Sequence, residues 1–241
     1  IPEAVNIIRG KKGTAVELTL VRENETAPIK VSLVRDTIVV KSASVDFSDN
    51  VAILKLTRFG DKTPEEWGEA VASILNAQSS NPSFKGVVLD LRNNPGGYLD
   101  GAVYLAGEFL AGGKTVVAQQ HGDGTRQEER VMRNGRLLKM PLVVLVNEGS
   151  ASAAEILAGA LQDYKRAKIV GVKTFGKGSV QQPEDFSDGS GIHITIAKWL
   201  RPSGEWIDKK GILPDMVVEM AATDSGDLKD DAQLQKAIEL L

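Results

Sequence analysis

From about residue 37 onward, short apolar runs alternate with amphipathic segments, and this order limits the fold more than any other feature of the chain. The apolar runs have the length of buried strands and cover residues 51–56, 86–91, 115–119, 142–146 and 169–172. A strand that is followed by a helix and a second strand normally forms a parallel pair. The order βαβαββα therefore predicts an α/β core with parallel strand pairing.

The helices of this core are marked by apolar spacing and by start signals. Thr63-Pro64-Glu65-Glu66 has the form of a capping box with proline at the first helical position. The helix that it opens carries its apolar residues at helical spacing on one face, namely Trp67, Val71, Ile74 and Leu75. Further helices are expected over residues 99–110 and 150–164.

The two ends of the chain follow other patterns. A short helix (3–9) and two alternating strands (15–21 and 29–34) are expected near the start, which is too little for an independent core. We interpret residues 1–36 as the second half of a small domain, and the start at Ile1 as the sign of a fragment or processed form. After residue 172 the chain becomes rich in β-structure, with strands expected at 179–182, 191–199 and 216–220. A last helix carries Leu234, Ala237, Ile238 and Leu241.

Composition excludes several kinds of chemistry. The chain has no cysteine, which removes disulfides, thiolate nucleophiles and zinc sites with sulfur ligands. With only His121 and His193 present, a histidine metal cluster is nearly excluded and a Ser-His-Asp triad has two candidate bases. A net charge of −3 argues against nucleic-acid binding, and no apolar run reaches the roughly 18 residues of a membrane span. The chemistry must therefore rely on hydroxyls, carboxylates, amides and lysine.

The first candidate segment, residues 147–155, follows a buried strand and opens a helix. Small residues there allow close approach of a substrate, and a helix N-terminus offers free N–H groups. A serine at this place could act as a nucleophile whose oxyanion is met by backbone amides. The structural alternative is equally simple: Ser152 and Glu155 fit a capping box, and Ser150 could be the N-cap.

The second candidate segment, residues 171–178, nearly matches the phosphate-binding loop G-x-x-x-x-G-K-[ST]. We reject that interpretation because Gly178 replaces the required hydroxyl and because the following residues predict a strand that ends at Pro183, not a helix. What remains is Lys177 between two glycines. A lysine that is kept from water has a lowered pKa and can act as a general base. Gln181 lies four residues further on, on the same face of the expected strand, where its amide could orient the amine.

The third candidate segment is the turn Asn93-Asn94-Pro95-Gly96-Gly97. Its ordinary interpretation is a loop between a strand and a helix, but paired glycines can also aim backbone N–H groups at an oxyanion. The two histidines have less suggestive surroundings: His193 is expected on the solvent side of a strand, and His121 in a loop. A Ser/Lys dyad is therefore the preferred arrangement.

These segments resemble those of the carboxyl-terminal processing proteases, serine endopeptidases with a Ser/Lys dyad. The resemblance runs from about Thr37 to the C-terminus and is most specific in S-A-S-A-A-E-I-L-A (150–158), Q-D-Y (162–164) and F-G-K-G-S-V-Q-Q (175–182). Supporting matches are D-L-R-N-N-P-G-G (90–97) and G-I-L-P-D (211–215).

The resemblance implies a role for each matching position. Ser152, rather than Ser150, would be the nucleophile, Lys177 the general base, and Gln181 the residue that holds the lysine. The oxyanion donors would be the backbone N–H groups of Ala153 and of Gly97, with Gly96 as the alternative. No metal or cofactor is implied, and the expected fold is a crotonase-like α/β core with additional β-structure.

The resemblance also implies an organisation for the whole chain. Residues 1–36 would be the C-terminal half of a PDZ-like domain, without its carboxylate-binding loop, and residues 37–241 the protease core. Expected partners are proteins or peptides with exposed C-termini, an adaptor or regulatory protein, and further copies of the chain, but no nucleic acid. The expected location is outside the cytoplasm, in a bacterial periplasm or cell envelope.

Two other functions compete with the protease. One is a peptide-binding module on the same fold that has lost catalysis; the presence of Ser152, Lys177 and Gln181 together argues against it. The other is a hydratase or thioesterase acting on acyl-CoA, which would need an acidic pair for which the sequence offers no candidate.

Overall fold

The computed structural model describes residues 2–22, 25–38, 40–220 and 230–241. The chain forms two compact units, Ile1–Val40 and Lys41–Leu241. The first contains helix α1 (Pro2–Ile8) and an antiparallel hairpin of β1 (Ala15–Leu20) and β2 (Ile29–Val34). Arg35 joins them, since its guanidinium donates to Ile8 O at 2.8 Å and to Ala15 O at 2.7 Å.

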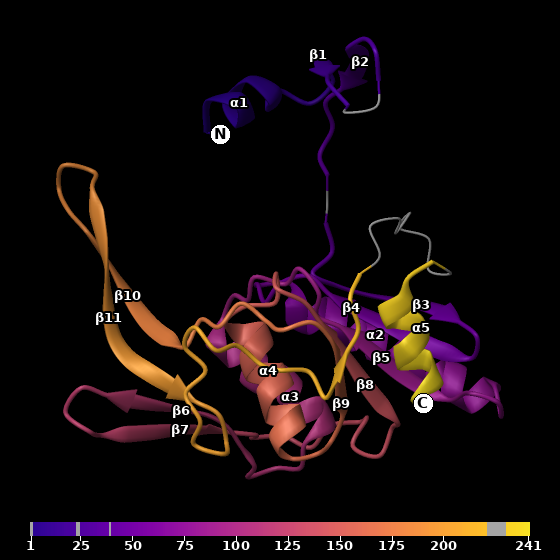
Figure 1. The fold of residues 1–241 in the computed structure, drawn as a ribbon, viewed down its shortest axis with the longest axis vertical. Helices are drawn as coiled ribbons and strands as arrows, with labels where there is room; N and C mark the ends of the chain where they lie inside the picture. Colours follow the sequence, from indigo (N-terminus) through magenta and orange to yellow (C-terminus); the bar gives the residue numbers. More distant parts are fainter. Residues whose placement is uncertain (1, 23–24, 39, 221–229) are drawn as a thin grey trace. The chain divides into compact units, whose positions relative to one another are not determined.

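The second unit is built on a six-stranded sheet with the order β12-β9-β8-β5-β4-β3 (Figure 1). Five of these strands are parallel, namely β4 (Val51–Leu56), β5 (Gly86–Asp90), β8 (Leu142–Val146), β9 (Lys168–Gly171) and β12 (Met216–Val217). The edge strand β3 (Ala43–Ser48) pairs with β4 in the antiparallel sense. The expected α/β core with parallel pairing is therefore confirmed.

Helices cover both faces of this sheet. Helices α2 (Thr63–Ser80), α3 (Leu99–Phe109) and α4 (Ala153–Asp163) share one core with Leu54 and Leu89, whereas α5 (Ala232–Glu239) packs on a second core with Ile53 and Val88. Neighbouring strand residues enter different cores because side chains alternate across a strand. Trp67 of α2 is fully buried and meets Phe109 edge to face, with the ring centroids 5.9 Å apart.

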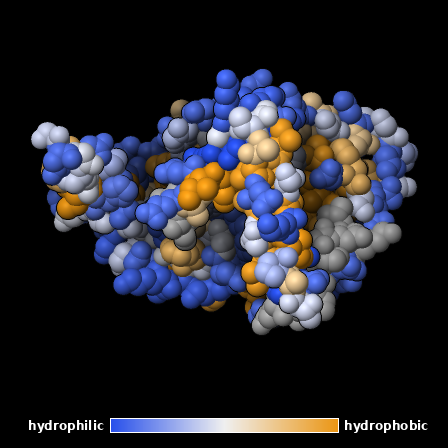
Figure 2. All heavy atoms as spheres, turned by 90° about the horizontal axis from the view of Figure 1, so that it is seen from above, coloured by the Kyte–Doolittle hydropathy of each residue, from blue (hydrophilic) through white to orange (hydrophobic). Residues whose placement is uncertain are grey.

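A second sheet has the order β10-β11-β6-β7. Its strands are β6 (Thr115–His121), β7 (Arg126–Arg130), β10 (Ser179–Asp185) and β11 (Gly191–Leu200), all antiparallel. The far part of the β10–β11 hairpin projects from the unit (Figure 1), and residues 191–196 are exposed on both faces, including three isoleucines. Apolar side chains thus reach the surface, and Figure 2 shows hydrophobic patches among hydrophilic atoms on the face that it displays.

Three local expectations need correction. Residues 63–66 form no capping box: the N-cap is Lys62, and the Glu66 carboxylate instead accepts from Ser42 N–H at 2.6 Å. Strands β3 and β7 were not expected. The sequence of β7 is wholly polar, whereas β3 alternates Ala43, Val45 and Phe47 with polar residues, a strand pattern that was overlooked. Strand β10 does not end at Pro183 but continues to Asp185, since β10 is an edge strand on which a missing N–H is tolerated.

No helix within the described ranges is both long and apolar enough to cross a membrane.

The stability of the fold depends on pH through one buried carboxylate. Glu108 is fully buried and accepts from Arg136 N–H at 2.6 Å and from the Arg133 guanidinium at 2.9 Å. Burial alone would raise the pKa of Glu108, but these hydrogen bonds hold that pKa below its usual 4.5. Because the pKa of Glu108 is lower in the folded state, this group stabilises the protein at pH values above its unfolded-state pKa. That stability is lost as the pH falls through the folded-state pKa.

Glu108→Gln should therefore lower the free energy of unfolding at pH 7 by about 1–3 kcal/mol, and make stability decline less steeply below about pH 4.5. Urea unfolding at a series of pH values measures both effects. Glu65→Gln, at an exposed position of α2, is the control and should follow the unsubstituted protein. Parallel pH curves for the Glu108 variant and the unsubstituted protein would contradict the assignment.

Candidate active site

The turn between β8 and α4 presents Ser152 to a cavity. Ser152 is the N-cap of α4 and has φ 54° and ψ −117°, a conformation that side-chain-bearing residues rarely adopt. Its N–H donates to Glu155 Oε2 at 2.9 Å, so the capping-box interpretation also holds. Such a strained conformation persists only where the surroundings impose it, and it is often found at functional sites.

Ser150 has a different environment, although it lies only two residues away. It is fully buried, and its Oγ donates to Leu91 O at 2.8 Å and accepts from Asn147 N–H at 3.0 Å. Its hydroxyl therefore joins the turn to the end of β5 and is engaged on both sides. Of the two serines, Ser152 has the accessible position.

A cavity of about 200 Å³ lies beside Ser152 and brings together all five residues that the sequence singled out. Its lining consists of Gly97, Leu99, Ser152, Ala153, Ile156, Lys177, Ser179, Val180, Gln181 and Trp199. The residues come from α3, α4, the segment leading into β10, β10 itself and β11. The central sheet thus supplies the serine side of the cavity and the second sheet the lysine side.

The glycine turn lies directly against Ser152. A Cβ at Gly96 would come within 2.8 Å of Ser152 Cβ and 3.0 Å of Ala153 N, and one at Gly97 within 2.0 Å of Phe59 O. Both glycines have positive φ values, 102° and 136°. Neither position therefore accepts a side chain, which explains why two glycines stand here.

The N–H groups of the two glycines differ in their hydrogen bonding. Gly96 N–H donates to Asn94 Oδ1 at 2.9 Å, and Gly96 O accepts from Phe59 N–H at 2.9 Å. Because the C=O and N–H of a trans peptide point in opposite directions, the Gly97 N–H points away from Phe59. No acceptor for it is found among the described residues. Gly97 rather than Gly96 thus has a free N–H at the cavity.

Glu155 connects the serine turn to the lysine segment, a role that the sequence did not reveal. Besides Ser152 N–H, its buried carboxylate accepts from Thr174 Oγ1 at 2.5 Å, Gly176 N–H at 2.7 Å and Lys177 N–H at 3.0 Å. Glu155 was recognisable only as a capping residue. The buried Thr174 had no sequence signal beyond its place in the glycine-rich segment.

Lys177 lies at the cavity, but not on the strand that was expected to carry it. Strand β10 begins at Ser179, and the register shifts between Val180 and Gln181. The expected same-face relation of Lys177 and Gln181 along one strand is therefore wrong, although both residues line the cavity. Lys177 is half-buried and Gln181 is exposed. Within the described part of the chain, no hydrogen bond of either side chain is found.

The remaining candidates stay outside this cavity. His193 is exposed on β11, and His121 ends β6. Among the described residues no group of histidine, cysteine, aspartate and glutamate side chains could hold a metal ion. The segment after Gly178 enters a strand and not a helix, as the argument against a phosphate loop required.

A family model and several relatives of known sequence show what this chain is similar to. The model of peptidase family S41 matches residues 50–218. A probable CtpA-like serine protease of Staphylococcus epidermidis is 43% identical over 222 residues, covering 90% of this chain and 43% of that protein. The carboxy-terminal processing protease CtpA of Bacillus subtilis is 39% identical over 221 residues, covering 91% and 46%. The chain thus spans less than half the length of these two relatives.

A solved structure agrees with these relatives. That of the photosystem II D1 C-terminal processing protease has a TM-score of 0.69 and 30% identity, covering 94% of this chain and 60% of the other. The resemblance to the carboxyl-terminal processing proteases is therefore confirmed. Since the family model matches most of the sequence, the chain belongs to peptidase family S41.

Proposed function

We propose that the chain carries the catalytic centre of a serine endopeptidase that cleaves protein or peptide substrates near their C-termini. The observation that carries the proposal is the single cavity lined by Ser152, Lys177, Gln181, Gly97 and Ala153. A hydroxyl, an amine and free backbone N–H groups together meet the needs of acyl transfer. No metal or cofactor takes part.

In this proposal the reaction proceeds through an acyl-enzyme. The neutral amine of Lys177 takes the proton of Ser152 as its Oγ attacks the peptide carbonyl, and then gives that proton to the leaving amine. Lys177 next takes a proton from the water that attacks the Ser152 ester, and returns it to Ser152 Oγ as the ester bond breaks and the new C-terminus leaves. During the reaction, Gln181 orients the amine toward the serine through its side-chain amide.

The oxyanion is stabilised by two backbone donors. One is the N–H of Ala153, which belongs to the first turn of α4 and so lacks a partner within the helix. The other is the N–H of Gly97, which points away from its neighbour Phe59. The positive end of the α4 dipole adds to the attraction for the negative oxygen.

The cavity also indicates which residue precedes the cleaved bond. Its lining is both polar and apolar, and its volume is only about 200 Å³. Such a volume has room for a small side chain, whereas a large one would force the surrounding residues apart.

The rest of the proposal concerns the whole protein. Residues 1–36 are the C-terminal half of a PDZ-like domain, and residues 37–241 are the protease core. Partners are substrate proteins, with an adaptor and further copies of the chain as additional partners. The protein acts outside the cytoplasm, in the periplasm or cell envelope, which the absence of cysteine supports.

Casein, an unstructured protein, should be cleaved by the intact protein, with cuts mainly after small residues because of the cavity's small volume. Mass spectrometry of the products identifies the cut bonds, and a fluorophosphonate should label Ser152 and stop the reaction. An acyl thioester serves as the comparison substrate and should be a poor one. Intact casein together with an unlabelled Ser152 would favour the peptide-binding module, and preferred thioester hydrolysis the acyl-CoA enzyme.

A further inference from the structure

The C-terminal helix α5 lies on the opposite face of the central sheet from the helices of the active site. It contributes no residue to the catalytic cavity, and its apolar residues Leu234, Ala237 and Ile238 pack in the second core. The helix begins at Asp231, whose Oδ1 accepts from Leu234 N–H at 2.9 Å and so caps it. The second oxygen of the same carboxylate remains for another contact.

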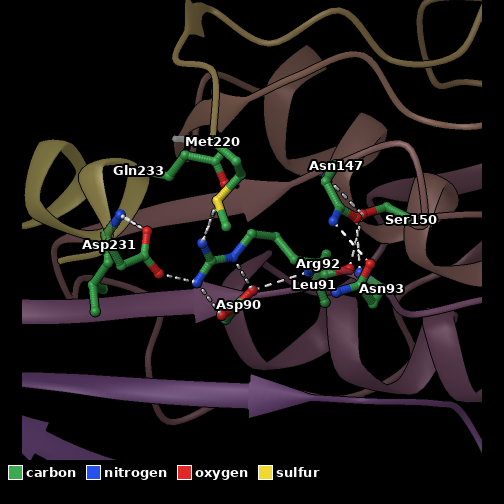
Figure 3. Close-up of polar contacts among 10 residues, drawn as sticks. Asp90, Leu91, Arg92, Asn93, Asn147, Ser150, Met220, Asp231 and Gln233 are labelled. Atoms are coloured by element: carbon green, nitrogen blue, oxygen red, sulfur yellow. Dashed lines mark hydrogen bonds and ion pairs between the residues drawn. The ribbon is translucent and has the colours of Figure 1, made fainter. Parts of the chain in front are cut away.

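That contact is an ion pair with Arg92, two residues after β5. Arg92 Nη2 lies 2.6 Å from Asp231 Oδ2 and 2.8 Å from Asp90 Oδ2, while Nη1 donates to Gln233 Oε1 at 3.2 Å (Figure 3). The Arg92 and Asp231 side chains are only 13% and 10% exposed. The guanidinium is therefore held by the end of β5 on one side and by α5 on the other, as its planar fork allows.

The protonation states agree with this geometry. Burial alone would lower the pKa of Arg92, but its hydrogen bonds to Asp90 and Asp231 hold that pKa above its usual value. Burial alone would raise the pKa of Asp231, but Arg92 holds it below its usual value. Both groups are thus charged at neutral pH.

The backbone that follows Arg92 leads to the oxyanion turn through further fixed contacts. Asn93 N–H donates to Asn147 Oδ1 at 2.8 Å, and Asn147 Nδ2 donates back to Asn93 Oδ1 at 2.9 Å (Figure 3). The buried Asn94 donates to Leu56 O at 2.8 Å and accepts from Gly96 N–H at 2.9 Å. These contacts hold residues 93–96 as one connected segment that ends at Gly97. Arg92 is the residue at which this segment leaves β5, so a shift of Arg92 would be passed along it.

We propose that Asp231 and Arg92 are positioning residues, through which α5 sets the place of the Gly97 N–H in the catalytic cavity. This inference rests on the proposed function, because it assigns the Gly97 N–H to the oxyanion. A donor in an oxyanion hole acts only at the correct distance from the oxygen. A displacement of about 1 Å can reduce the rate about 100-fold.

Asp231→Asn tests the proposal with the least damage to the fold. Asparagine keeps an oxygen that can cap α5 but removes the negative charge that faces Arg92. We expect kcat for peptide cleavage to fall about 10- to 100-fold while KM changes little. Arg92→Lys should act in the same direction, since a single ammonium cannot hold Asp90, Asp231 and Gln233 together.

Ile238→Val is the matched control, because Ile238 belongs to the apolar face of the same helix and its side chain has no polar group that could bind Arg92. Midpoints of thermal unfolding give the stability lost in each variant. The control should keep kcat close to that of the unsubstituted protein at equal folded fraction. Equal losses of kcat in both variants, or full activity of Asp231→Asn, would show that α5 acts on stability alone and overturn the proposal.

Amide hydrogen exchange provides a measurement that does not depend on catalysis. Asp231→Asn should accelerate exchange in residues 92–97, and Ile238→Val should not. If the unsubstituted protein cleaves no peptide, the proposed function fails, while the exchange comparison still decides whether α5 holds the glycine segment. Unchanged exchange at 92–97 in Asp231→Asn would overturn the inference even in an active protease.

Discussion

Replacing Ser152 with alanine is expected to reduce peptide-bond cleavage by about 10⁴- to 10⁶-fold. The reason is chemical: Oγ is the atom that forms the ester, and among the residues that the structure describes no other hydroxyl has both the strained turn and the cavity beside it. Cleavage of a fluorogenic peptide under single-turnover conditions measures the loss. Circular dichroism should show an unchanged fold, because alanine leaves the backbone contacts of the turn in place.

Ser150→Ala is the control for this substitution. It removes a buried hydroxyl that donates to Leu91 O and accepts from Asn147 N–H. We expect a loss of about 1–3 kcal/mol in the free energy of unfolding, with cleavage still measurable in the folded fraction. Activity in Ser152→Ala together with none in Ser150→Ala would reverse the assignment of the nucleophile.

Lys177→Ala is expected to lower cleavage by about 10⁴-fold or more, since a general base and its nucleophile act as one unit. The fold should survive, because the contacts that hold this segment use the backbone N–H groups of Gly176 and Lys177, which alanine retains. Initial rates with the same peptide measure the effect. Labelling of Ser152 by a fluorophosphonate should slow in parallel, as the serine loses its activating amine.

Lys173→Ala is the matched control for the lysine. Lys173 lies four residues earlier in the same glycine-rich segment, but it is exposed and does not line the cavity. Its replacement should leave the cleavage rate close to that of the unsubstituted protein. Substantial cleavage by Lys177→Ala would exclude the dyad and require another base near Ser152.

The sequence predicts most of the core of this fold for a simple reason. The strands β5 and β8 are buried on both faces and so appear as continuous apolar runs, and the apolar face of α2 is marked by Trp67 and Val71. The strand β7 could not be predicted, because Arg126–Arg130 is polar and is held only by pairing with β6. An exposed strand without apolar residues has no periodic signal, even where it pairs with its neighbour in a hairpin.

The same limit applies to the site. The sequence motifs and the family resemblance named five of the ten residues that line the cavity, since glycines, a capped helix start and an unusual lysine are local features. The contacts of Glu155 with Thr174 and Lys177 join segments that only the fold brings together. The ion pair of Arg92 with Asp231 is likewise invisible in a single sequence, in which both residues look like ordinary surface charges.

The base and the outer part of the β10–β11 hairpin serve different purposes. The base carries Gln181 and Val180 at the cavity, where Gln181 pairs with Thr195. Residues 191–194, further out, are exposed on both faces and take no part in either core. Substitutions in the outer part therefore change the surface that approaching polypeptides meet without altering the hydroxyl, the amine or the packing beneath them. Substrate choice can diverge there between descendants of one ancestral enzyme while the chemistry is inherited intact.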